Sequence, residues 1–236
     1  MAAKPRSTPN LPINYAEQLS KEAAEITKRI AAPSGDRVRF NANRGFITPD
    51  GLEGSELEVV IVDFISTNLF YEGDFDRDNP QAPGCFALGA EPATLVPSSN
   101  SPAKQAPTCA SCPNNQFGSA RNGKGKACKN TRLIAVMPAH AADDPDNAPI
   151  WIISIPPASI KSFDSYVHSL SVKQRTVPVG VVTSITLDPD VTFAAPRFSV
   201  VRPVDPKSLG VFMSRREEAN QRLYIEPDVS QYAVAG

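Results

Sequence analysis

Residues 56–70 read ELEVVIVDFISTNLF, the longest stretch of the chain with the composition of a β-strand. Within it, residues 59–65 are VVIVDFI, and β-branched and aromatic residues of this kind favour extended backbone. The sequence therefore predicts a long strand here, and the other elements can be placed on either side of it.

Shorter strands and three helices are predicted around this stretch. The chain has 236 residues, of which 23 are proline, and so much proline argues against a helical bundle because proline breaks helix interiors. Apolar periodicity and turn residues predict strands at 37–40, 46–48, 133–137, 150–155, 177–187 and 192–201, and helices at 14–32, 159–170 and 205–224.

The order of these elements indicates a fold class. When the two short strands before residue 50 are merged into one, and likewise the two that follow residue 132, five strands remain, with a helix between the third and the fourth. This is the connectivity of the OB-fold, a small, partly open barrel that commonly binds oligonucleotides. We therefore expect a mainly β protein with peripheral helices (β+α), built as a five-stranded OB-fold-like barrel. The expected parts are a flexible tail at 1–13, an N-terminal helix at 14–32, the barrel domain at 35–204 with an insertion at 80–132, and a C-terminal helix and tail at 205–236.

The charge of the chain is divided by segment. The net charge is -1, which by itself points away from a nucleic-acid partner. Between Asp50 and Glu91, however, there are ten acidic residues and one basic residue, whereas between Pro92 and Ala142 there are six basic residues and no acidic one. Because charges are screened over roughly 8–10 Å, a local basic segment attracts a polyanion whatever the total charge. Mutual neutralisation of the two segments is the alternative.

The four cysteines of the chain predict a metal centre in the insertion. Cys109 and Cys112 form a Cys-x2-Cys pair, and Cys85 and Cys128 complete a set of four ligands for tetrahedral zinc. The insertion has little periodicity, and a structural metal would order it with a binding free energy on the order of 10 kcal/mol. An iron–sulfur cluster is the less favoured alternative, because four cysteines alone do not separate the two. Two disulfides are disfavoured in a chain that starts without a secretory signal.

Basic and aromatic residues predict a surface for single-stranded nucleic acid, which combines a basic groove with aromatic platforms. Arg121, Lys124, Lys126 and Lys129 form a glycine-spaced basic run beside the last cysteine, and Phe117 precedes it in a loop that has little core to fill. The further candidates are Arg37, Arg39, Arg44, Phe46, Tyr71, Arg132 and Trp151. For phenylalanines in strands, a place in the core is the more common alternative.

The sequence offers no convincing catalytic constellation, and we expect the protein not to be an enzyme. His140 and His168 have no partnered nucleophile nearby in sequence. Residues 74–85 begin like a calcium loop, but Asn79 and Cys85 replace the glycine and glutamate that the loop requires. No apolar run approaches the roughly 20 residues of a membrane helix, so we expect a cytoplasmic protein, in the host cytoplasm if the chain is viral.

Four strings carry a resemblance to a known family: CFALG from Cys85, CASCPNNQFGS from Cys109, GKGKACK from Gly123 and TRLI from Thr131. Together they resemble tailed-phage single-stranded DNA-binding proteins of the OB-fold type that carry a metal-knuckle insertion. The resemblance implies cooperative, sequence-tolerant coating of single-stranded DNA in phage replication or recombination, with replication or recombination proteins and further copies of the chain as partners. An iron–sulfur enzyme acting on DNA and a zinc-braced structural module of a phage particle are the alternative functions.

Overall fold

The computed structural model describes Tyr15, Gln18 and residues 35–41, 45–73, 81–142 and 148–230. The chain divides into two compact units, Met1–Gly35 and Asp36–Gly236. In the first unit Tyr15 and Gln18 are helical, while the predicted tail at 1–13 and the rest of the predicted helix at 14–32 lie outside the described residues. The second unit contains all of the elements discussed below.

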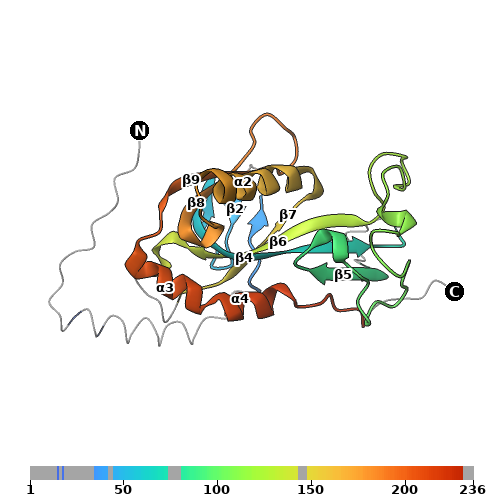
Figure 1. Ribbon diagram of the computed structural model, residues 1–236, viewed down its shortest axis with the longest axis horizontal. Coiled ribbons are helices and arrows are strands. Elements are labelled where there is room, and N and C mark those ends of the chain that lie inside the picture. The colour runs from blue at the N-terminus through green and yellow to red at the C-terminus, as the bar shows by residue number, and fades with distance from the viewer. Residues whose placement is uncertain are drawn as a thin grey trace. The chain divides into compact units, whose positions relative to one another are not determined.

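The long strand β4 (Glu56–Phe70) organises the main sheet and has the bounds that the sequence predicts. One edge of β4 pairs antiparallel with β6 (Lys129–Pro138), from Val59 opposite Pro138 to Leu69 opposite Lys129. The other edge is divided between two strands, because β8 (Val181–Leu187) pairs with its first residues and β5 (Cys85–Gly89) with its last. One strand therefore runs through both the main sheet and the insertion (Figure 1).

The strand order of the main sheet is β7-β6-β4-β8-β9, with β5 on the free part of β4. Here β7 spans Trp151–Ile155 and β9 spans Pro196–Pro203. A separate small sheet has the order β1-β2-β3, with β1 at Arg39–Phe40, β2 at Phe46–Ile47 and β3 at Glu53–Gly54. Among the described residues the two outer strands β7 and β9 do not pair, so no closed barrel is formed. A mainly β architecture with a few helices is confirmed.

Helices cover both faces of the main sheet, because β4 turns alternate side chains to opposite sides. On one side Val59 and Ile61 share a buried cluster with Phe163 of α2 (Ile160–Lys173). On the other side Val60 and Val62 pack with residues of α3 (Pro206–Ser214) and α4 (Arg216–Leu223). Figure 1 shows α2 on one side of the sheet and α3 and α4 on the other.

Aromatic packing fixes α2 on its face of the sheet. The ring of Phe163 is fully buried and lies 5.2 Å, centroid to centroid, from the rings of both Phe64 and Phe198 in edge-on geometry. Such pairs contribute about 0.5–1.5 kcal/mol beyond the area that they bury. The predicted helix at 159–170 is thus confirmed, and its apolar stripe is the face that packs.

The merging of strands predicted from the sequence is wrong in two places. The first hairpin belongs to the small sheet, and β6 and β7 are separate antiparallel neighbours, with Val136 opposite Trp151. The five strands β4, β6, β7, β8 and β9 nevertheless have a helix, α2, between the third and the fourth. The predicted first strand lies outside the main sheet, but the predicted third strand is two strands, so the number five is still reached. The insertion follows the first of the five strands instead of the second.

The predicted C-terminal helix is divided in two. Asp205 caps α3 by accepting a hydrogen bond from the backbone N–H of Lys207 at 2.9 Å, with Pro206 in the first turn, as the sequence indicates. The helix ends at Ser214, and α4 begins at Arg216. Arg216 and Asn220 of α4 both donate to Asp63 Oδ2, at 3.2 and 3.3 Å, so the second helix is tied to β4 at the bulge between Ile61 and Asp63.

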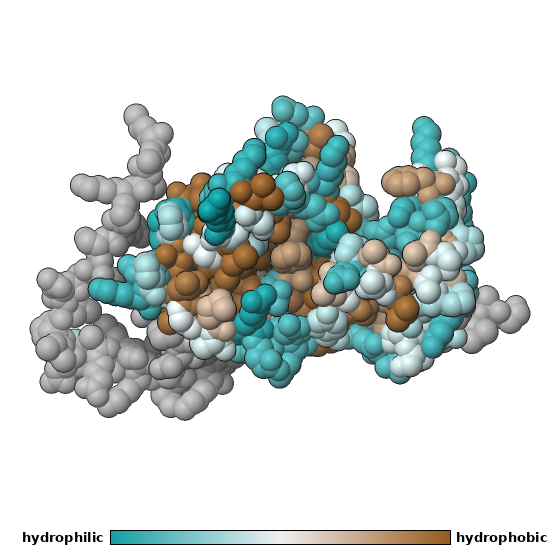
Figure 2. Space-filling model, in the orientation of Figure 1, coloured by the Kyte–Doolittle hydropathy of each residue, from teal (hydrophilic) through white to brown (hydrophobic). Residues whose placement is uncertain are grey.

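The insertion between β4 and β6 consists mainly of turns. Besides β5 it contains two short 3-10 helices, η1 (Pro92–Thr94) and η2 (Pro113–Asn115). Its own buried apolar cluster comprises Ala87, Leu95 and Cys109. In Figure 2 the surface of this part is mainly hydrophilic, whereas several hydrophobic residues show over the main sheet. Hydrogen bonds therefore carry much of its order, and Glu226 at the far end of the chain adds bonds to Ser98 and to Asn100.

Candidate nucleic-acid interface and metal centre

The four cysteines lie together at the end of β4. Cys85 faces Phe70 in the β4–β5 pair, and Cys128 directly precedes Lys129, which faces Leu69 in the β4–β6 pair. The register of the two pairs thus brings Cys85 and Cys128 to opposite edges of the same strand end. All four thiols are free and buried, and all four line one small enclosed cavity of about 10 Å³.

The Cys-x2-Cys segment is a tight turn whose ends are held by hydrogen bonds. Thr108 and Ser111 bond through their hydroxyl groups at 2.8 Å, and the backbone N–H of Cys109 donates to Leu95 O at 2.9 Å. After the second cysteine, the N–H of Asn115 donates to Cys112 O at 3.0 Å. The segment that the spacing predicts to be a metal knuckle is therefore an ordered turn over the cavity.

Burial and mutual repulsion disfavour the thiolate forms. Burial, together with the smaller effect of the neighbouring Cys109, Cys112 and Cys85, raises the pKa of Cys128 to about 12. Burial also raises the pKa of Cys109, although a hydrogen bond with Asn68 opposes that shift. The deprotonated forms would require a compensating cation.

The four thiols are not positioned to coordinate one metal ion without rearrangement. In residues 35–41, 45–73, 81–142 and 148–230, together with Tyr15 and Gln18, no three His, Cys, Asp or Glu side chains are placed so that they could hold a metal ion as they stand. Zinc–sulfur bonds are about 2.3 Å long, so the thiols would have to turn inward to meet one ion. The donor set, its burial and the shared cavity fit a thiolate-bound metal, and the cavity has room on the order of one atom.

An asparagine layer, made by Asn68, Asn115 and Asn130, surrounds this centre. The amide of Asn130 donates to Asn68 Oδ1 at 2.5 Å and to Asn115 Oδ1 at 2.9 Å. The amide of Asn115 donates in turn to Cys109 O at 2.8 Å. These residues are absent from the predicted site: Asn115 resembles an ordinary turn residue, and Asn68 and Asn130 are single polar residues within strands.

A groove of about 860 Å³ opens beside the four cysteines. One wall is the end of β4 with the residues that follow it, and the other is the loop that precedes β6. Its lining includes Tyr71, Arg121, Lys126 and Lys129, so the structure brings together four of the residues predicted for nucleic-acid binding. The remaining lining residues are Phe70, Glu72, Gly73, Gln81, Asn114, Ser119, Ala120, Asn122 and Ala127.

Cations and aromatic rings are paired at this groove. The ammonium of Lys129 lies 5.2 Å from the centroid of the Tyr71 ring, and that of Lys126 lies 5.4 Å from the centroid of the Phe117 ring. The side chain of Phe117 is 84% exposed, which is unusual for phenylalanine. Each pair offers a positive charge and a flat π surface next to each other, the two elements that single-strand binders combine.

Arg121 and Lys124 occupy the outer part of the same loop. Arg121 donates from Nη2 to the backbone O of Glu72 at 2.8 Å, which bridges the two walls of the groove. Lys124 is exposed between Gly123 and Gly125, both of which have positive φ. The backbone there takes a conformation that favours glycine, and the tight loop presents Lys124 to solvent.

Arg132 lies three residues after Lys129 on β6, and its side chain has other partners. Its guanidinium forms an ion pair with Asp164 of α2 at 3.0 Å and donates to Ser66 Oγ at 2.9 Å. The side chain is 11% exposed. The structure thus gives Arg132 a contact between sheet and helix and does not bring it into the groove.

The other predicted nucleic-acid residues lie elsewhere. Phe46 and Trp151 are 1% and 5% exposed and belong to the core cluster beneath α2. Arg37 and Arg39 are exposed, and Arg37 bridges to Ile152, which faces Ala135 of β6. Ala135, beside the Arg37 bridge, is six residues along β6 from Lys129 of the groove, or roughly 20 Å at 3.3 Å per residue. Arg44 lies outside the described residues.

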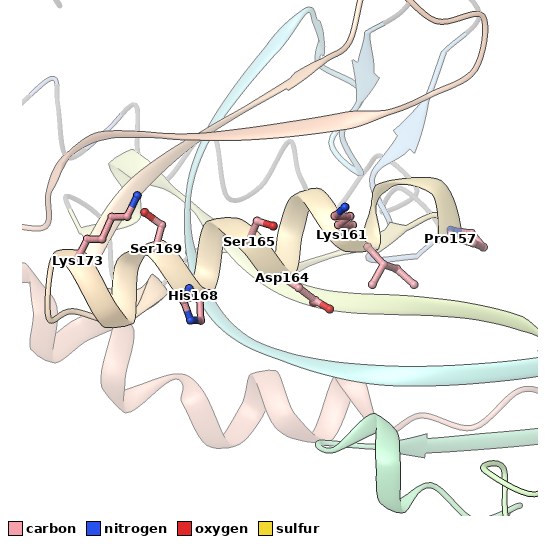
Figure 3. Close-up of a pocket in the computed structure, with 8 residues that line it drawn as sticks. Pro157, Lys161, Asp164, Ser165, His168, Ser169 and Lys173 are labelled. Atoms are coloured by element: carbon pink, nitrogen blue, oxygen red, sulfur yellow. The ribbon is translucent and has the colours of Figure 1, made fainter.

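A second, shallow depression runs along α2 (Figure 3). Lys161, Ser165, His168 and Lys173 line it, together with Asp164, which already binds Arg132. Apart from Pro157, its lining comes from this one helix, and neighbouring turns present their side chains in different directions. This arrangement does not converge on a ligand.

No helix in the described parts of the chain is long and apolar enough to span a bilayer. Comparisons of the chain with protein-family models, with curated proteins and with solved structures found no match.

Proposed function

We propose that this chain is a non-enzymatic, sequence-tolerant single-stranded DNA-binding protein, with the groove beside the four cysteines as its binding site. The observation that carries the proposal is the pairing of Lys129 with Tyr71 and of Lys126 with Phe117 around that groove. Stacking of one base on an aromatic side chain contributes about 1–3 kcal/mol and tolerates any base. Arg121 and Lys124 add positive charge at the same end of the molecule.

The topology supports this function. The strand order β7-β6-β4-β8-β9 with α2 between β7 and β8 has the connectivity of an OB-fold that is left open between its third and fifth strands. In that scheme the insertion is the loop between the first two strands. Loops at this position commonly contact oligonucleotides in OB-folds. The main sheet is thus proposed as a scaffold, and the insertion as the part that holds the DNA strand.

The four cysteines are proposed to hold a structural zinc ion. Zinc bound to thiolates would add metal–ligand bonds to the small apolar cluster of the insertion. An iron–sulfur cluster is the alternative, because four cysteines can also hold one. A role in phage replication or recombination follows from the resemblance of the cysteine segment to the phage proteins.

The test is a titration of the zinc-loaded full chain with fluorescent oligo-dT at several salt concentrations. If four cations contact phosphates, the slope of log affinity against log salt should be about -3 for a single strand. The charge reversal Lys124→Glu with Lys126→Glu should weaken binding strongly. The matched control is Lys161→Glu with Lys173→Glu on α2, which makes the same change in net charge away from the groove.

Two results would refute the proposal. One is an absence of oligo-dT binding by the wild type at about 50 mM salt, where phosphate contacts are strongest. The other is equal loss of binding in the two charge-reversed variants, because that would assign the attraction to total charge. If metal analysis finds iron and sulfide with a broad visible absorption band, the zinc assignment is replaced by a cluster.

A further inference from the structure

The asparagine layer connects two parts of the proposed site that are separate in sequence. Asn68 belongs to β4, Asn130 to β6 and Asn115 to η2. Their amides form a continuous series of hydrogen bonds, since Asn130 donates to both of the other two. The layer is packed between the end of the main sheet and the cysteine turn.

One end of the layer reaches the metal centre through a single cysteine. Asn68 hydrogen-bonds the thiol of Cys109, and Asn115 donates from Nδ2 to the carbonyl of the same residue at 2.8 Å. Residues that bond metal ligands in this way orient them and commonly change metal affinity by 10- to 100-fold. The hydrogen bond from Asn68 would strengthen once Cys109 becomes a thiolate, because charged acceptors form stronger bonds.

The other end of the layer reaches the groove. Asn115 Oδ1 accepts a hydrogen bond from Lys126 Nζ at 3.3 Å, and this is the ammonium that lies over the exposed ring of Phe117. One amide side chain therefore holds the backbone of a cysteine with its nitrogen and a groove lysine with its oxygen. A shift of the cysteine turn moves Asn115, and with it the acceptor of Lys126.

We propose that Asn115 is a positioning residue that couples the metal centre to the groove, so that metal and single-stranded DNA bind cooperatively. The proposal rests on the proposed function of the groove and adds to it a regulation by metal occupancy. Linkage makes the effect reciprocal: if zinc tightens DNA binding by some factor, DNA tightens zinc binding by the same factor.

The experiment measures the affinity of the full chain for zinc by competition with a chromophoric chelator, with and without saturating oligo-dT. For the wild type we expect zinc to bind about tenfold more tightly in the presence of DNA, within the usual range of coupling between sites. In Asn115→Ala the ratio should fall below about twofold. The matched control is Asn100→Ala, which removes an insertion asparagine that bonds Glu226 and should keep the wild-type ratio.

The ratio separates coupling from a purely structural role. If Asn115 only stabilised the turn, its loss would weaken zinc binding equally with and without DNA, and the ratio would stay at the wild-type value. That result overturns the proposal, as does a wild-type ratio of one. A wild type that binds zinc but no oligo-dT refutes instead the proposed function.

A second variant applies if Asn115→Ala does not retain zinc. Asn115→Asp keeps an acceptor for Lys126 but replaces the donor to Cys109 O with a carboxylate oxygen. It should bind oligo-dT within about threefold of the wild type when zinc-loaded, while the DNA-dependent ratio of zinc affinities falls below about twofold. An unchanged ratio in this variant contradicts the coupling.

Discussion

The two ends of β4 are stabilised by different means. Around residues 59–62 the strand is covered on both faces by hydrophobic clusters and helices. Around Ser66, Thr67 and Asn68 its buried neighbours include hydroxyl, amide and thiol groups beside a small apolar cluster. The first end gains its stability from apolar burial, whereas the second depends on hydrogen bonds and, as proposed, on a metal. The scaffold should therefore tolerate conditions that disorder the proposed binding site.

Metal removal should produce the largest difference between the two ends. Chelation of zinc, or Cys112→Ser, is expected to abolish a metal contribution on the order of 10 kcal/mol in the insertion. Hydrogen exchange should then show loss of protection in residues 85–128, while β6, β7 and β8 stay protected. Loss of protection throughout the sheet would contradict the comparison, because it would make the main core depend on the metal.

The pH dependence of metal binding tests the electrostatics of the cysteine end. The raised pKa values of Cys109 and Cys128 keep these thiols protonated at neutral pH without metal, so zinc must displace their protons. Zinc affinity should accordingly rise with pH, by about tenfold per pH unit for each proton displaced. Competition titrations at several pH values measure this slope. A flat profile would mean that the metal does not displace protons from these cysteines.

Phe163→Ala tests the apolar end. Removal of a fully buried phenylalanine should lower the free energy of unfolding by about 3–5 kcal/mol. Thermal or urea unfolding measures the change, and oligo-dT affinity of the folded fraction should stay at the wild-type value. Phe193→Ala is the matched control, because that ring is 53% exposed and its loss should change stability by no more than about 0.5 kcal/mol.

Phe117→Ala should have the opposite profile. Its ring lies on the surface, so the melting temperature should not change, while binding of oligo-dT should lose about 1–3 kcal/mol, or roughly 5- to 150-fold. Phe117→Trp keeps a stacking surface and should retain affinity. If the alanine variant binds DNA normally, the ring only packs against Lys126, and Phe117 is removed from the proposed binding site.

The smallest effect is expected at Arg39. It is exposed on β1, two residues after Arg37, which bridges to Ile152 of β7, and fields from exposed charges decay within roughly 8–10 Å. Arg39→Glu should weaken oligo-dT binding less than about twofold, while Lys124→Glu has the larger effect. Equal effects in an anisotropy titration would extend the path of DNA across the small sheet.

Local patterns in the sequence predict the elements well. Residues 56–70 form a strand with the predicted bounds because their composition leaves few alternatives, and the apolar stripe of α2 predicts both the helix and its packed face. Strand pairing was not predictable in the same way, because hydrophobicity shows that a strand is buried but not which neighbour it has. For that reason the sequence-based prediction joins β1 and β2 into one strand, and β6 and β7 into another.

The candidate site shows the same limit. The basic run and Tyr71 meet at one groove, since each adjoins a cysteine or the end of β4. Trp151 and Arg132 are likewise an aromatic and a basic residue, yet Trp151 is in the core and Arg132 pairs with Asp164. Composition does not distinguish these environments. The asparagine layer has no signal in the sequence, because the register of β4 and β6 brings Asn68 to Asn130, and the fold of the insertion brings Asn115 to both.

That register also explains how a small domain can carry so long an insertion. Leu69 and Lys129 face each other in neighbouring strands, so the chain leaves the sheet and returns to it at the same place. The entropy of closing a loop grows only with the logarithm of its length, by about 0.6 kcal/mol per doubling. For the β4–β6 pair, the insertion thus connects the two strands as a hairpin turn would. Its length can change without strain on the strands that it connects.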